Sequence, residues 1–265
     1  LAPAMLLIPA LMTFAVIPFG TTITLFGREV PLQVADLNVG ILYILALTSI
    51  GVYGLVLAGW ASNSKYSLIG GLRSSAQLIS YELAMGLSVV SVILLAGSLK
   101  LNVIVEDQQG YLLSWNVFKQ PVAFLIFLVA VYAETNRLPF DLTEAEQELV
   151  GGYHTEYSSM KFAMFFTAEY ANMVTAAALT VTLFFGGWDV PLLNETSMGA
   201  LGAILSVSSF ILKTAFFLFL FIWVRWTFPR FRYDQLMKLG WKVMLPLALI
   251  NIFVTGGYLT LTSLR

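Results

Sequence analysis

The chain has 265 residues, of which 58% are hydrophobic and 11% are charged, and its mean hydropathy is +0.84. These values lie outside the range of soluble domains and are typical of a chain that crosses a membrane several times. The net charge of -1 gives no basic surface for nucleic acid. The chain has no cysteine and a single histidine, so it lacks the ligands for an iron–sulfur cluster or a b-type haem. We therefore expect no metal ion or redox cofactor bound by this chain.

Long apolar runs recur along the sequence, and several reach the ~20 residues that a helix needs to cross a bilayer. We expect an all-α fold, a polytopic transmembrane helical bundle that forms a single membrane domain over residues 1–265. Seven spans are expected, at about residues 1–20, 39–60, 76–97, 117–133, 161–185, 203–228 and 241–261. Because the first residue is a Leu inside an apolar run, we expect an upstream segment in the complete protein.

An acidic loop at residues 134–160 separates the fourth and fifth expected spans. Its Asp and Glu residues are Glu134, Asp141, Glu144, Glu146, Glu148 and Glu156. Thr143 followed by Glu146 has the spacing of a capping box, which predicts a short helix that begins near residue 143 and ends at Gly151. On such a helix Glu144 and Glu148 share one face and repel each other. The lone histidine, His154, is expected to be a polar loop residue.

Lysine and arginine are concentrated in the loops on the side of the membrane that holds the acidic loop. By the positive-inside rule, this bias predicts that the acidic loop is cytoplasmic. Seven spans would then leave the C-terminus on the periplasmic side.

Two acids are expected inside the membrane at the same depth. Glu82 follows Arg73, and Glu169 follows Lys161, at such a spacing that both carboxyls lie ~12 Å below the cytoplasmic ends of their helices. Buried acids at one depth suggest a polar layer that exchanges protons. The alternative is that both are structural carboxyls, hydrogen-bonded to neighbouring polar side chains.

Two further features of the spans leave alternatives open. Lys213 lies near the middle of the sixth span, where an ammonium needs a partner. A salt bridge to a neighbouring protein and a place in a proton path are equally compatible with that position. The aromatic residues from Phe162 to Phe166 lie just below the acidic loop, where they either pack in the core or line an apolar ligand site.

Four stretches of the sequence resemble one family along the whole chain. They are ETNRLPFDLTEAEQELVGGYHTEYSSMKF at 134–162, AGWASNSKYSL at 58–68, AQLISYE at 76–82 and RYDQLM at 232–237. These motifs are similar to those of the H-type membrane subunit of proton-pumping NADH:quinone oxidoreductase, respiratory complex I. That family has a first span and an amphipathic helix before the segment that begins here, so the seven spans correspond to its second to eighth.

The resemblance implies a subunit that forms the membrane side of a quinone chamber and couples quinone reduction to proton translocation. Quinone is then the substrate, while FMN and iron–sulfur clusters belong to partner subunits. The implied partners are the peripheral iron–sulfur and quinone-site subunits and small membrane subunits, in the bacterial cytoplasmic membrane. By position, the residues implied in the chamber loop are Arg137, Asp141, Glu156 and Phe162, and those implied in proton coupling are Glu82, Glu144, Glu146, Glu148 and Glu169.

Two other functions remain open from the sequence. The homologous membrane subunit of an energy-converting hydrogenase shares this fold and couples to a nickel–iron site instead of quinone. A stand-alone proton-coupled transporter would also use intramembrane charges such as Glu82, Glu169 and Lys213.

Overall fold

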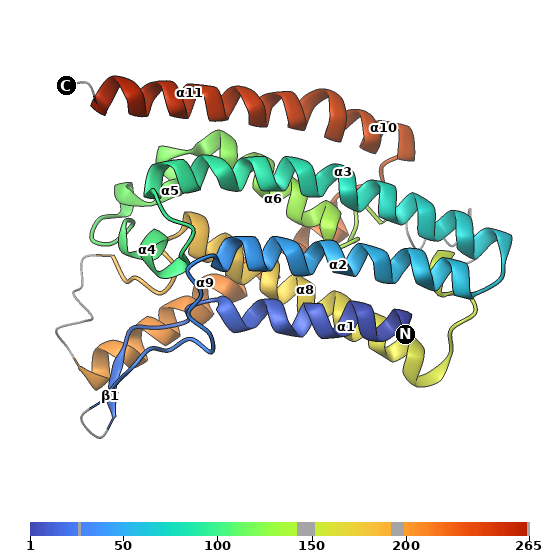
Figure 1. Ribbon diagram of the computed structural model, residues 1–265, viewed down its shortest axis with the longest axis horizontal. Helices are drawn as coiled ribbons and strands as arrows, with labels where there is room; N and C mark the ends of the chain where they lie inside the picture. The colour runs from blue at the N-terminus through green and yellow to red at the C-terminus, as the bar shows by residue number, and fades with distance from the viewer. Residues whose placement is uncertain (26–27, 142–151, 192–198, 264–265) are drawn as a thin grey trace.

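The computed structural model describes residues 1–25, 28–141, 152–191 and 199–263, which form a bundle of long helices lying side by side (Figure 1). The long helices are α1 (Ala2–Thr13), α2 (Gly40–Ala61), α3 (Lys65–Ala96), α6 (Pro121–Glu134), α8 (Ser159–Phe184), α9 (Ala200–Thr227) and α11 (Leu245–Ser263). Shorter helices are α4 (Leu101–Glu106), α5 (Asn116–Lys119) and α10 (Tyr233–Lys238), with a 3-10 turn η3 at Gly152–His154. The expected all-α class is confirmed, with one small addition. A hairpin that the sequence did not predict, β1 (Ile23–Leu25) paired with β2 (Arg28–Val30), extends from one end of the bundle (Figure 1).

Four helices of the described residues are long and apolar enough to cross a membrane. They are Gly40–Ala61, Lys65–Ala96, Leu201–Thr227 and Tyr233–Thr262, and they overlap the second, third, sixth and seventh expected spans. The apolar helices Ala2–Val16 and Pro121–Glu134 are shorter. The expected total of seven spans is therefore not confirmed, while the multi-pass character is supported by the length and composition of these four helices.

Helix α3 begins at Lys65, well before the expected start of the third span at residue 76. Its first turns pack against the end of α2 through glycines. A Cβ atom on Gly59 would lie 2.7 Å from the carbonyl oxygen of Ser67, and one on Gly71 would lie 3.1 Å from that of Leu55. Because neither glycine has a side chain, the backbones of α2 and α3 approach closely. This packing accompanies an α3 helix that begins before its apolar run, at Lys65.

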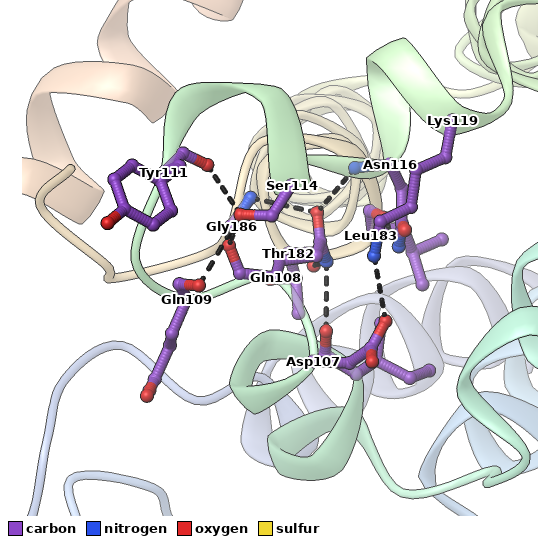
Figure 2. Close-up of polar contacts among 11 residues, drawn as sticks. Asp107, Gln108, Gln109, Tyr111, Ser114, Asn116, Lys119, Thr182, Leu183 and Gly186 are labelled. Carbon is purple, nitrogen blue, oxygen red and sulfur yellow. Dashed lines mark hydrogen bonds and ion pairs between the residues drawn. The ribbon is translucent and has the colours of Figure 1, made fainter.

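Gln108 joins the segment before α6 to the end of α8 (Figure 2). Its side-chain Nε2 donates hydrogen bonds to the carbonyl oxygens of Ile104 (3.0 Å) and Thr182 (3.1 Å). Its Oε1 accepts hydrogen bonds from the backbone N–H groups of Asn116 and Gly186, both at 3.1 Å. The fully buried amide thus uses both of its donors and both of its acceptor positions, and it fixes this end of the bundle.

Candidate functional site

A small cavity inside the bundle is lined by three carboxylates from three helices. Glu82 comes from α3, Glu134 is the last residue of α6, and Glu169 comes from α8. The remaining polar lining consists of Thr13, Thr48, Thr135, Asn136, Tyr153 and Asn172. The cavity offers about 50 Å³ to water-sized molecules, which is enough for a few waters bound to polar groups. We call this space, with its three carboxylates, the acid cavity.

Glu82 receives hydrogen bonds from hydroxyl groups of α2. The Ser49 Oγ donates to Glu82 Oε1, and the Thr48 side chain forms a second hydrogen bond with the same carboxyl group. The depth count from the sequence expected Glu82 and Glu169 in one layer, and the structure brings both to the acid cavity. Their role in proton exchange stays a prediction.

Glu134 was expected at the start of the acidic loop and was not among the predicted site residues. The structure extends α6 through this residue, so its carboxylate faces the acid cavity, where its charge and that of Glu82 repel each other. A signal was present in the sequence. Glu134 follows Phe127 and Ala130 at helical spacing, and both of those residues are fully buried.

Arg137 connects the acid cavity to the segment that precedes residue 142. Its Nε lies 3.0 Å from Oε1 of Glu169, and the two side chains are only 10% and 15% exposed. The guanidinium group also stacks over the ring of Tyr170, with 4.6 Å from Cζ to the ring centroid. The family resemblance implied Arg137 in the chamber loop, and its ion-pair partner in the structure is an acid of α8.

Asp141 lies at the end of the same segment. Its Oδ2 accepts a hydrogen bond of 3.0 Å from Nη2 of Arg230, which lies beyond the end of α9. Three predicted proton-coupling acids, Glu144, Glu146 and Glu148, lie outside the described residues, as does the short helix expected near residue 143.

Glu156 and Phe162 are placed in different surroundings. Glu156 is exposed and lines an open depression of about 800 Å³ together with Trp60 and Tyr157. Phe162 packs its ring against His154 and Phe166, at centroid distances of 5.5 and 4.6 Å. His154 is thus half-buried among aromatic rings, which differs from the polar loop position expected for it.

Lys213 has its partners within the chain. Its Nζ donates to the carbonyl oxygens of Phe185 (2.9 Å), Gly187 (3.1 Å) and Asp189 (2.6 Å), and it lies 4.7 Å from the ring centroid of Trp115. Burial raises the pKa of the Asp189 carboxyl group, and the nearby Lys213 ammonium opposes that change. The ammonium caps the end of α8 that lies ~24 Å along the helix from the acid cavity. A place for Lys213 in a proton path stays a prediction.

These features define a polytopic helical membrane protein with an internal cluster of ionisable groups, the kind of cluster that membrane proteins use for moving protons or ions. In the described part of the chain, no group of three or more His, Asp or Glu side chains is arranged to hold a metal ion. The site therefore offers carboxylates, one guanidinium group and room for water.

Comparison with known proteins identifies the family. The family model described as NADH dehydrogenase matches residues 1–256. The chain is 58% identical over 259 residues to the second H-type NADH-quinone oxidoreductase subunit of Geobacter sulfurreducens, covering 98% of this chain and 74% of the relative. It is 56% identical to the H-type subunit of Salinibacter ruber (95% of this chain, 73% of the relative) and 49% identical to that of Flavobacterium johnsoniae (96% and 73%). The chain belongs to the family of H-type subunits of NADH-quinone oxidoreductase, as its motifs indicated.

Proposed function

We propose that the chain forms the membrane side of the quinone chamber in a bacterial NADH-quinone oxidoreductase and couples quinone reduction to proton translocation through its buried carboxylates. The names of its relatives support NADH and quinone as substrates of the whole enzyme. They also favour this enzyme over an energy-converting hydrogenase. FMN and iron–sulfur clusters then belong to partner subunits, in agreement with the absence of cysteine from this sequence.

The observation that carries the proposal is the ion pair between Arg137 and Glu169. One partner belongs to the segment that leads into the acidic residues 142–151, and the other lines the acid cavity. A change of charge near the quinone acts on Arg137, and Arg137 acts directly on the cavity. Coupling of this kind requires only charges that interact at short range in a site largely removed from water.

The orientation that we propose puts the acidic residues on the cytoplasmic side and the C-terminus on the periplasmic side of the bacterial cytoplasmic membrane. The basic residues Arg225, Arg230 and Arg232 are exposed where α9 ends and α10 begins, as the positive-inside rule expects of a cytoplasmic connection. The junction of α2 with α3 and the start of α10 lie at one end of the bundle, and β1 lies at the other (Figure 1).

The experiment that tests the proposal uses the assembled complex in membrane vesicles. Glu82→Gln or Glu169→Gln should lower NADH:quinone turnover and proton pumping together, because each removes a charge from the coupling site while nearly keeping its volume. NADH oxidation by ferricyanide, which bypasses the quinone site, should stay near wild type. The matched control is Glu106→Gln, an exposed acid that does not line the acid cavity.

Three outcomes would overturn the proposal. Wild-type pumping in both variants would remove the carboxylates from the coupling path. Equal loss of the quinone and ferricyanide activities would mean that the acids serve assembly alone. Purification of the chain without partner subunits, in an active transporting form, would favour the stand-alone transporter instead.

A further inference from the structure

The segment at residues 137–141 carries a second ion pair, formed with a distant part of the chain. Nη2 of Arg230 lies 3.0 Å from Oδ2 of Asp141, and the two side chains are 35% and 12% exposed. The other carboxylate oxygen of Asp141, Oδ1, is buried and has no hydrogen-bond partner among the described residues. Arg230 is therefore the main described counter-charge of a carboxylate that is largely removed from water.

Backbone and aromatic contacts hold the same segment independently of this ion pair. The Phe231 N–H donates to the Pro139 carbonyl oxygen (3.1 Å), and the rings of Phe231 and Phe140 lie 5.5 Å apart. On the other side, Nε2 of Gln77 donates to the Phe140 carbonyl oxygen (2.9 Å), and the Phe140 ring lies 5.7 Å from that of Tyr81. None of these contacts uses the Arg230 or Asp141 side chain, so the segment should stay folded when the ion pair is removed.

We propose that Arg230 is a positioning residue for quinone reduction. Through Asp141, it holds in place the segment at residues 137–141, whose Arg137 and Asp141 the family resemblance places in the loop that faces the quinone chamber. The inference rests on the proposed function. Beyond the proposed function, the inference is that Arg230, 89 positions from Asp141 in the sequence, positions a segment of the chamber wall without touching the quinone.

The chemistry of the pair explains why arginine suits this position. A guanidinium group forms directional, charge-assisted hydrogen bonds with a carboxylate, so it fixes orientation as well as charge. A lysine keeps the charge but loses the planar geometry, and a glutamine keeps polarity but loses the charge. The three side chains therefore separate orientation from simple charge balance.

The test measures steady-state kinetics with a short-chain quinone in the assembled complex. Arg230→Gln should raise the KM for quinone by about fivefold, the effect of roughly 1 kcal/mol for a partly exposed pair. Complex content and NADH:ferricyanide activity should stay unchanged, and Arg230→Lys should give an intermediate KM. Asp141→Asn should match Arg230→Gln, and the double variant should be no worse than either single one, because both remove the same interaction. The control is Arg225→Gln, an exposed arginine for which the described part of the chain provides no ion-pair partner.

An unchanged KM in Arg230→Gln, or additive effects in the double variant, would overturn the inference. If Arg230→Gln lowers complex content, the inference is tested with Arg230→Lys instead. An assembled Arg230→Lys complex with a wild-type KM for quinone would show that the guanidinium geometry is not needed, and it would overturn the inference. The two variants that test the proposed function, Glu82→Gln and Glu169→Gln, are measured beside these variants. Unchanged quinone reduction in both of them contradicts the proposed function itself. An effect there without one in the Arg230 variants contradicts only the role of Arg230.

Discussion

The ion pair between Arg137 and Glu169 predicts a strong energetic coupling between these two residues. Arg137→Gln leaves the Glu169 carboxylate without its guanidinium partner, and Glu169→Gln leaves the guanidinium without its carboxylate. The double variant removes both charges together. We therefore expect the double variant to be less impaired than the sum of the two single variants.

The magnitude follows from the distance and the burial of the two side chains. At 3.0 Å and an effective dielectric constant of about 20, the attraction between unit charges is roughly 5 kcal/mol. Removing one partner of a buried pair typically costs ~3–5 kcal/mol, whereas an exposed pair contributes only ~0.2–1 kcal/mol. With side chains 10% and 15% exposed, the buried range applies to each single variant. The coupling energy between the two residues should be about 2–3 kcal/mol, the upper part of the range for side chains in contact. Even half of that value in the quinone step lowers turnover about tenfold.

The assay is NADH:quinone turnover in membrane vesicles, normalised to NADH:ferricyanide activity so that differences in complex content cancel. Tyr170→Phe serves as the control, since it keeps the aromatic ring beneath Arg137 and should leave turnover unchanged. Additive losses in the double variant would refute the reasoning, because they would mean that the two side chains act separately. Normal complex yield and turnover in Arg137→Gln would refute it as well.

Three further predictions concern other parts of the chain. Glu148→Gln should lower quinone-linked turnover and spare ferricyanide reduction, and equal loss of both would indicate a structural role. Gln108→Ala should lower the melting temperature of the purified complex, because two buried backbone N–H groups and two carbonyl oxygens each lose a hydrogen-bond partner, at a cost of ~2–4 kcal/mol. Gln109→Ala, at an exposed position, should leave the melting temperature unchanged. Gly59→Ala should reduce complex yield because its Cβ would lie 2.7 Å from a backbone oxygen, whereas Gly86→Ala, with no atom within 4 Å, should be tolerated.

The sequence predicted the helical class and a common depth for Glu82 and Glu169, because both predictions use regular helix geometry. The depth was counted at 1.5 Å per residue from Arg73 and Lys161, whereas α3 itself begins earlier, at Lys65, and α8 begins at Ser159. That the two carboxylates line one cavity depends on how α3 and α8 pack, which the sequence did not predict. The ion-pair partner of Arg137 could not be predicted from the sequence. A salt bridge across 32 positions depends on how helices pack, which no local pattern records.

Boundaries were the least predictable part of the fold. The start of α3 was expected too late because Lys65 and Arg73 lower the local hydropathy, although glycine packing against α2 keeps those turns helical. The end of α6 was expected one residue too early, and this single residue hid Glu134 from the predicted site. In both cases hydropathy located the apolar core of a helix and not its end.

Under the proposed function, Arg137 would carry the response of this chain, which has no cysteine, to quinone reduction outside it. Arg137 pairs with a carboxylate of the acid cavity, and in the sequence it precedes the acidic residues 142–151. If a change of charge at the quinone draws its guanidinium away from Glu169 by about 2 Å, their attraction at an effective dielectric constant of about 20 weakens by roughly 2 kcal/mol. A change of that size alters an equilibrium among the three carboxylates by more than about tenfold. The proposed coupling would therefore need only a small side-chain motion and no change of fold.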